Sequence, residues 1–234
     1  MRDLPMTTVA ILQPGYLPWL GFFDQMSRSD VFVYFDDVQY DKHGWRNRNR
    51  IKSATGLIWL TVPVLNTGRH GQKINEVEID NRSPWARKHI TAIAQNYAKA
   101  PHLKRYLPQL DAMLSRHWES LVELDLAVVE LICHWIGIER QIERSSCLGI
   151  GGEQSERLLN ICKYFQADRY LSGDSAQNYL DVKLFLDAGV QVEWQSYPHP
   201  TYPQLHGEFV PYLSVLDLVI NVGEKSLDVL TGKP

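Results

Sequence analysis

The sequence predicts an α/β fold, a Rossmann-like parallel sheet with a β-hairpin and a three-helix insertion. Short β-prone runs alternate with helical patterns at both ends of the 234-residue chain, which is typical of parallel strands joined by helices. Between the two ends, further β-prone runs and three consecutive helical patterns interrupt this alternation. We expect one compact domain over residues 1–234, with the helical insertion at about 83–137.

The N-terminal run predicts the first βαβ unit. Val9–Leu12 is a short apolar strand that ends at Gln13-Pro14-Gly15, because two nearby prolines around a glycine cannot continue a strand. Apolar residues at helical spacing follow over 19–29, and a second β-prone run begins at Asp30. Parallel strands end at the same edge of a sheet, so polar residues after them are expected to gather there: Gln13, Tyr16, Asp36 and Asp37.

The middle of the chain predicts the hairpin and the insertion. Two β-prone runs, 58–64 and 74–79, flank a polar loop with two glycines, which predicts a hairpin. Ser83-Pro84 is a typical helix start, and the apolar spacing beyond it predicts helices that end near residue 100 and that cover about 102–116 and 121–136.

The C-terminal part returns to alternating helices and strands. It predicts strands at 167–171 and 190–195 and a final helix at about 211–221. Ser172-Gly173-Asp174 follows the first of these strands, and it is either an anion site at the start of a helix or an ordinary helix cap. After the second strand, three prolines fix a loop that carries His199, Tyr202 and Gln204.

The segment 41–50 has the clearest chemical character. It combines cations with amides and an indole, and this mixture suits an anionic ligand with a planar face, because arginine pairs with phosphate or carboxylate and tryptophan stacks. In an extended segment the arginines share one face, which either holds an anion or is a solvated strand face. The residues concerned are Lys42, Trp45, Arg46, Asn47, Arg48, Asn49 and Arg50.

Composition and spacing argue against several other classes of protein. The formal net charge of −3 makes nucleic acid an unlikely partner, although a loop of Trp, Arg and Asn also suits single-stranded RNA. The three cysteines form no CxxC pattern and are expected to be reduced, and the histidines lack metal-ligand spacing, so no metal site is expected. No apolar run approaches the roughly 20 residues of a membrane span, which predicts a cytoplasmic protein.

Several blocks of the sequence resemble the WbqC-like protein family. They are QP-x-YLPW at 13–19, FDDVQY-x-K at 35–42 and WRNRNRIK at 45–52, and later blocks extend the resemblance over nearly the whole chain. These blocks also contain Trp19 and Gln39, which we place with the substrate-binding residues. The resemblance implies a role in surface-polysaccharide (O-antigen) biosynthesis, with transfer of an amino acid such as glycine onto a sugar.

These observations give three hypotheses about function. The first is a transferase that acts on a nucleotide-activated sugar or an activated amino acid, which needs a base and cations on phosphate. Asp36, Asp37 and His199 are the candidate catalytic residues, and the remaining polar and aromatic residues named above would bind a small anionic substrate. The alternatives are a non-catalytic nucleotide-sugar-binding protein and a nucleotidyltransferase-like enzyme. The sequence assigns no cofactor and no oligomeric state.

Overall fold

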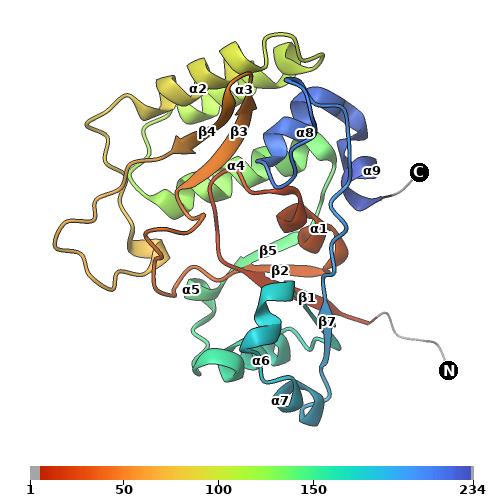
Figure 1. The fold of residues 1–234 in the computed structure, drawn as a ribbon. Coiled ribbons are helices and arrows are strands. Elements are labelled where there is room, and N and C mark those ends of the chain that lie inside the picture. Colours follow the sequence, from red (N-terminus) through yellow and green to blue (C-terminus); the bar gives the residue numbers. More distant parts are fainter. Residues whose placement is uncertain (1–5, 233–234) are drawn as a thin grey trace. The chain divides into compact units, whose positions relative to one another are not determined.

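The computed structural model describes residues 6–232, and the chain forms two compact units. The first unit contains the residues up to Gln13, then Asp24–Asp36 and Glu139–Pro198. The second contains Pro14–Phe23, Asp37–Ile138 and the residues from His199 onward. Figure 1 colours the chain along its sequence, so the repeated passage between the units can be followed. The expected single domain over residues 1–234 stays a prediction.

The first unit is built on a five-stranded parallel sheet. In chain order, the strands lie in the spatial sequence 3-2-1-4-5, because β5 and β2 are on one side of β1 and β6 and β7 are on the other. This is the order of a Rossmann-like sheet, which confirms the predicted fold class. The strands are β1 (Thr8–Leu12), β2 (Val31–Tyr34), β5 (Gln141–Arg144), β6 (Arg169–Ser172) and β7 (Gln191–Trp194).

Apolar side chains of the first unit form a core between this sheet and its helices. Val9 and Val31, which pair across β1 and β2, pack in one cluster with Ile161, Cys162 and Phe185. Burial on both faces explains why β1 and β2 are continuous apolar runs rather than alternating ones. The helical elements are part of α1 (Leu20–Arg28), α5 (Ser145–Leu148), α6 (Gln154–Tyr164), the 3-10 turn η2 (Asp174–Asn178) and α7 (Val182–Asp187).

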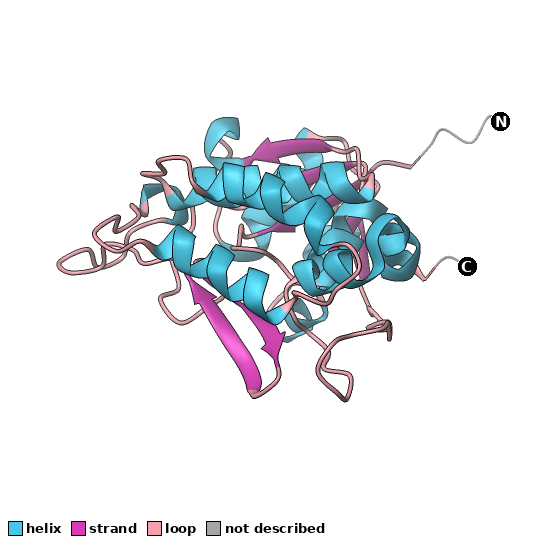
Figure 2. Cartoon of the chain, turned by 90° about the horizontal axis from the view of Figure 1, so that it is seen from above, coloured by secondary structure: helices cyan, strands magenta, loops and turns pink. Residues whose placement is uncertain are grey.

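The second unit combines an antiparallel hairpin with helices. The hairpin consists of β3 (Arg48–Ser53) and β4 (Gly56–Thr61), and helix α2 packs against β3 (Figure 2). The helices of the predicted insertion are present as α2 (Trp85–Asn96), α3 (Leu103–Leu114) and α4 (Leu121–Ile136). The other elements are η1 (Ile74–Glu76), α8 (Val215–Val222), η3 (Gly223–Lys225) and α9 (Ser226–Thr231). No described helix has the length and apolar character to cross a membrane.

The predicted position of the hairpin was wrong. The partner of β4 is the preceding segment, β3, and the run 74–79 contributes a 3-10 turn and two isolated bridges, from Ile79 to Val64 and from Glu78 to Ser120. Val77 and Ile79 alternate as in a strand, but Ile74 and Val77 are three residues apart and both are buried, which fits one helical turn. The helix predicted after Ser172-Gly173-Asp174 is also interrupted, since η2 and a shorter α7 replace it.

The proline-rich turn after β1 is fixed by the segment that leads into β3. Gly15 is required here, since an added Cβ would lie 2.9 Å from the carbonyl oxygen of Trp45. Tyr16 N donates to the carbonyl of Arg46 at 3.0 Å, and the buried Asn49 side chain donates to the carbonyl of Leu17 at 2.7 Å. The two conspicuous N-terminal motifs therefore form one structure within the second unit.

This contact predicts the effect of an amide deletion. Asn49→Ala leaves the buried carbonyl of Leu17 without its donor, so the free energy of unfolding should fall by about 1–3 kcal/mol in urea denaturation. Asn178→Ala removes an exposed amide that bonds the carbonyl of Ser175 and should change stability far less. Equal losses in the two variants would contradict the anchoring role of Asn49.

Candidate functional site

The carboxyl edge of the parallel sheet collects part of the predicted site. Gln13 follows β1, Asp36 lies just beyond β2, and Ser172 ends β6, whose neighbour in the sheet is β1. The ends of β1 and β2 and the Ser172-Gly173-Asp174 turn therefore share one sheet edge. After β1 the chain continues to β2 in one direction along the sheet, and after β6 it continues to β7 in the other, so the strand order reverses between β1 and β6. Open α/β sheets bind ligands at such a switch point.

Asp36 is an anchored carboxylate rather than a free one. Its side chain is fully buried and accepts hydrogen bonds from Arg144 Nε at 2.8 Å and from the hydroxyl of Ser145 at 3.2 Å. It also accepts from Ser146, through the backbone N–H at 3.0 Å and the hydroxyl at 2.8 Å. This geometry favours a structural role, in which Asp36 holds the end of β5 and the start of α5.

The turn after β6 is likewise occupied by internal contacts. The Asp174 carboxylate accepts from the backbone N–H of Ser196 at 3.0 Å, and η2 contributes only a short 3-10 turn. Gly173 lies against Gln25, whose amide nitrogen would be 3.3 Å from an added Cβ. Gln25 in turn donates to the side chain of Gln195 at 2.7 Å. The N-cap of η2 is Gly173, which makes no side-chain cap bond, so these contacts support neither the helix-cap nor the anion-site interpretation.

The β3–β4 hairpin of the second unit has one buried face and one outer face. Antiparallel partners share a face, so Arg48 and Thr61, Arg50 and Trp59, and Lys52 and Leu57 lie on the same side of the hairpin. The alternate residues, including Asn49, Ile51 and Leu60, are buried. The predicted separation of arginines from asparagines is therefore confirmed for β3, and its arginine face points outward.

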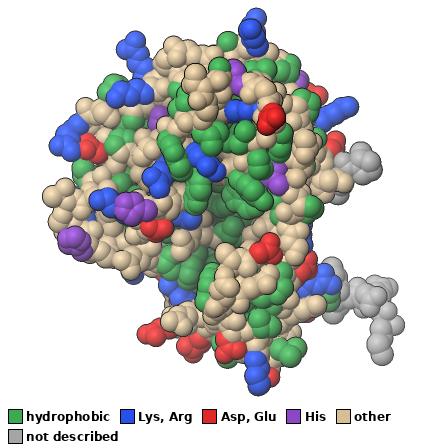
Figure 3. All heavy atoms as spheres, viewed as in Figure 1, with side chains coloured by type: hydrophobic (Ala, Val, Ile, Leu, Met, Phe, Trp, Pro, Cys, Tyr) green, Lys and Arg blue, Asp and Glu red, His purple; other side chains and the backbone are tan. Residues whose placement is uncertain are grey.

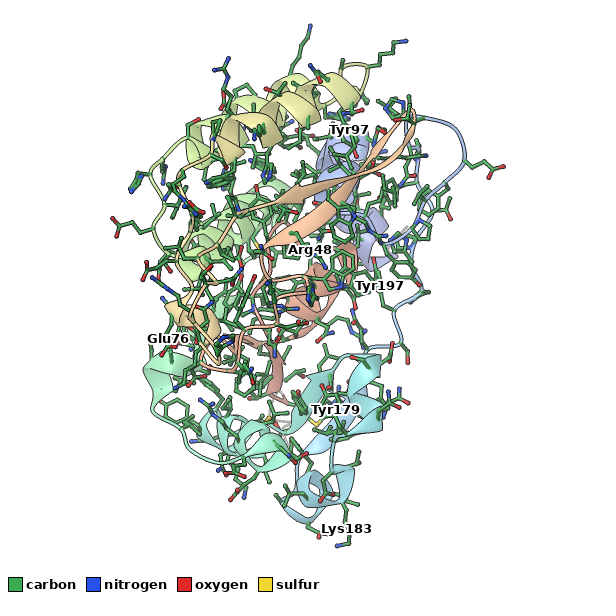
Figure 4. The ribbon with its side chains drawn as sticks, turned by 60° about the vertical axis from the view of Figure 1, so that its left-hand side comes forward. Arg48, Glu76, Tyr97, Tyr179, Lys183 and Tyr197 are labelled. Carbon is green, nitrogen blue, oxygen red and sulfur yellow. The ribbon has the colours of Figure 1, made fainter. Side chains whose placement is uncertain are left out.

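Two arginines and two tryptophans form a cluster on this outer face, which we call the Arg–Trp face (Trp45, Arg48, Arg50 and Trp59). The indoles stack with their ring centroids 5.3 Å apart, and each is nearly half exposed, at 43% and 46%. The Arg48 guanidinium lies 4.7 Å from the centroid of Trp59, and that of Arg50 lies 5.2 Å from Trp45. Figure 4 labels Arg48 on the hairpin. Figure 3, which colours side chains by type, shows Lys and Arg side chains next to hydrophobic ones on the molecular surface.

Other residues of the predicted basic segment lie outside this cluster. Arg46 donates from Nη1 to the carbonyl of Pro14 at 2.7 Å, and Asn47 is buried and bonds the carbonyl of Val62. Lys42 and Gln39 are exposed, and Gln39 forms a backbone bridge with Lys73. The half-buried Asp37 lies at the start of this stretch of the second unit.

A buried ionisable group in the second unit was missed by the sequence analysis. Asp125 on α4 is fully buried, and neither carboxyl oxygen has a partner among the described residues. Burial raises the pKa of this carboxyl well above its ordinary value, although the charge of Arg46 opposes the shift. Tyr40 Oη and Arg46 Nε are also buried without partners in that part of the chain. The only signal in the sequence was one aspartate within an apolar helical stripe.

The proline-rich loop is tied to its own unit by its predicted site residues. His199 is bonded at both ring nitrogens, to the carbonyl of Pro200 at 2.9 Å and by the backbone N–H of Tyr212 at 3.1 Å. Gln204 accepts from Lys52 Nζ at 3.2 Å and contacts the hydroxyl of Tyr202. Burial lowers the pKa of His199. A neutral imidazole with both nitrogens engaged is a poor candidate for a general base in this conformation.

Two aromatic residues of the first family block also have structural partners in the second unit. Trp19 packs with its ring centroid 5.6 Å from that of Tyr212, and its backbone bridges Ser214. Tyr16 is fully buried, and its hydroxyl lies 3.0 Å from Nδ1 of His89. His89 Nε2 is also 3.2 Å from the carbonyl of Thr61. The predicted substrate-binding residue Tyr16 is therefore part of a buried hydrogen-bond network.

An open groove lies between β4 and α2 of the second unit, with a volume of about 360 Å³. Trp59 of the Arg–Trp face is one of its walls, and His89 and Lys88 contribute from α2. The sequence offered little sign of this groove, because Lys88 and His89 have the pattern of a solvated helix face. The other lining residues are Ile58, Leu60, Thr61, Pro63, Ser83, Trp85 and Ala92.

Comparisons with known proteins agree with this fold and with the sequence blocks. The chain is an α/β protein, and it belongs to the WbqC-like protein family, whose model matches residues 13–229. It is 40% identical over 227 residues to Rv1507c of Mycobacterium tuberculosis (strain ATCC 25618 / H37Rv), described as an uncharacterized protein. That match covers 96% of this chain and 98% of the relative. No solved structure matches the chain.

The contacts of Asp36 predict what its neutralisation does. Asp36→Asn removes the charge that pairs with Arg144 and turns amide hydrogens toward donors, so unfolding free energy should fall by about 2 kcal/mol. Asp174→Asn alters an exposed carboxylate with one backbone donor and serves as the control. A fully stable Asp36→Asn protein with no catalytic turnover would instead support the catalytic assignment.

The pKa of Asp125 predicts a pH dependence of stability. A carboxyl whose folded pKa exceeds its unfolded value of about 3.9 binds more protons in the folded state, so its contribution to stability is lost as pH rises through that window. Asp125→Asn cannot ionise, so between about pH 4 and 8 its melting temperature should fall less with pH than that of the wild type. Asp228→Asn is the exposed control. Parallel pH profiles for wild type and Asp125→Asn would show that Asp125 does not retain its proton.

Proposed function

We propose that the protein is a cytoplasmic transferase of surface-polysaccharide biosynthesis that acts on a nucleotide-activated sugar. The Arg–Trp face would bind the nucleotide part of this substrate, with phosphate on the arginines and the base against an indole. An aminoacyl group such as glycine is the proposed group transferred. Membership of the WbqC-like family supports the general role, and the geometry of the hairpin supports the class of ligand.

The single observation that carries this proposal is the arrangement of arginine beside exposed tryptophan. A guanidinium that lies over an indole still has N–H groups in its own plane, and this fork matches the oxygen atoms of a phosphate. Arg48 already donates from Nε to the Gly44 carbonyl at 3.3 Å and from Nη2 to the His43 carbonyl, so a phosphate on this face would be bound by Nη1 of Arg48 and by the terminal nitrogens of Arg50. Exposed aromatic rings provide the stacking surface that a nucleobase needs.

The charge of the outer hairpin face points in the same direction. Its residues on β3 are Arg48, Arg50 and Lys52, and those on β4 are Leu57, Trp59 and Thr61, so no carboxylate of the hairpin competes for the cations. Lys52 is buried and bonds backbone carbonyls of Gly207 and Glu208, which leaves the two arginines as the accessible cations of this strand. A locally basic face is compatible with the negative net charge of the chain.

A second candidate function is binding of a nucleotide sugar without turnover. Its specific support is that both Asp36 and His199 are engaged in internal hydrogen bonds. The two functions differ in one measurement, the formation of a glycyl amide on a UDP-amino sugar that is supplied with an activated glycyl donor, with release of the donor's leaving group, followed by NMR. Catalysed formation of this amide would support the transferase, whereas binding without it would support the accessory protein.

The nucleotide site is tested by charge-conserving substitutions. Arg48→Lys and Arg50→Lys keep the charge but lose the planar fork, so each should weaken UDP binding in calorimetry by about 1–3 kcal/mol. Arg116→Lys, an exposed arginine on another surface of the same unit, is the matched control. Arg46→Lys should affect stability more than binding, because Arg46 bonds Pro14. Unchanged UDP affinity in both Arg48→Lys and Arg50→Lys would rule out the proposed nucleotide site.

A further inference from the structure

The groove between β4 and α2 is a second place where the unit can hold a ligand. Trp59 is shared between the groove and the Arg–Trp face, so a ligand bound on that face is adjacent to the groove. The groove itself is lined by apolar and aromatic side chains with a few polar ones, which is the usual composition of a small-molecule site. Three properties of the groove indicate which class of ligand it could bind: the charge of its lining, the exposed indole of Trp59 and its volume.

The charge of the lining comes from one residue. Among the described residues that line the groove, Lys88 is the only Lys, Arg, Asp or Glu, and its side chain is exposed. The Thr61 carbonyl can only accept, which places a proton on Nε2 of His89, and in the neutral ring Nδ1 then accepts from the Tyr16 hydroxyl. Burial lowers the pKa of His89 to about 4. The groove is therefore complementary to a ligand with a single negative charge.

The exposed ring is Trp59. Its side chain is 46% exposed although it is large and apolar, whereas Trp85 across the groove is nearly buried and donates its indole N–H to Asn81 at 3.2 Å. An exposed indole beside hydroxyl groups suits the apolar face of a sugar ring, with its hydroxyls free to bond. Ser83 and Thr61 supply such polar groups in the lining.

The size of the groove restricts the ligand further. Its volume of about 360 Å³ is at the lower end of the roughly 300–1,000 Å³ of ligand pockets, which suits one sugar ring better than an oligosaccharide.

An extended peptide could instead pair with β4, whose only strand partner among the described residues is β3. The carbonyl of Thr61 is already occupied by His89, so this position of the free edge is unavailable for pairing.

We propose that this groove binds the pyranose ring of a sugar that carries one carboxylate, with the ring against Trp59 and the carboxylate against Lys88. The inference rests on the proposed function, because it names the sugar class that such a transferase would act on. It also adds Lys88, Trp59 and Ser83 to the residues that determine specificity. Binding here needs no covalent step, so it can be measured with simple glycosides.

The experiment compares two sugars that differ in this charge. The intact protein is titrated with methyl glucuronoside and with methyl glucoside, and binding is followed by ligand-detected NMR. We expect the glucuronoside to bind more tightly, and Lys88→Ala to weaken it roughly five- to tenfold while glucoside binding is little changed. Lys104→Ala removes an exposed lysine on α3 and is the matched control. Trp59→Phe, which keeps an aromatic ring, should weaken both sugars.

Each contrary result overturns the inference. Equal affinity for the two sugars, no saturable binding of either at millimolar concentration, or the same glucuronoside affinity in Lys88→Ala and wild type would each exclude a carboxylated sugar. Tight binding of an extended peptide that glucuronoside does not displace would assign the groove to a protein partner. A UDP titration of the wild-type protein reports separately on the Arg–Trp face, so failure of the groove and failure of the nucleotide site are distinguishable.

Discussion

The buried amides before and within β3 are the constraint on which the second unit's surface depends. Asn47 bonds the carbonyl of Val62 and Asn49 bonds that of Leu17, so these two side chains point into the protein. Since successive residues of a strand face opposite sides, the inward position of Asn49 places Arg48 and Arg50 outward. A shift of the register by one residue would bury the arginines and expose the amides. The amides thereby determine both the packing of the hairpin and the chemistry of its outer face.

The fold was largely predictable because its strongest signals are local. Val9–Leu12 and the run from Asp30 are apolar and β-prone over short lengths, and helices α2 to α4 have clear apolar spacing. The run 74–79 was misassigned because Val77 and Ile79 alternate as in a strand, whereas the spacing of Ile74 and Val77 is that of a helical turn. The strand β5 was not predicted, since Gln141–Arg144 has little apolar pattern and owes its position at the edge of the sheet to pairing with β2.

The candidate site was less predictable, because side-chain roles depend on partners that are distant in sequence. Asp36 has the appearance of a catalytic acid next to a strand, yet Arg144 and Ser146, more than a hundred residues later, occupy its oxygens. Trp59 begins one of the later blocks that resemble the family and Lys88 has the pattern of a solvated helix face, but only the packing of α2 beside the hairpin brings them to one groove. The arginine alternation was predictable from strand geometry alone, whereas its outward direction required the observed burial of Asn49.

We propose that the Arg–Trp face holds the phosphates of a nucleotide-activated sugar, and a crystal structure of the protein with UDP would test this site directly. We expect the diphosphate to lie within hydrogen-bond distance of the Arg48 or Arg50 guanidinium and the uracil ring to lie against Trp45 or Trp59. A diphosphate bound at the carboxyl edge of the parallel sheet, beside Gln13 and Gly173, with the hairpin unoccupied, would contradict it.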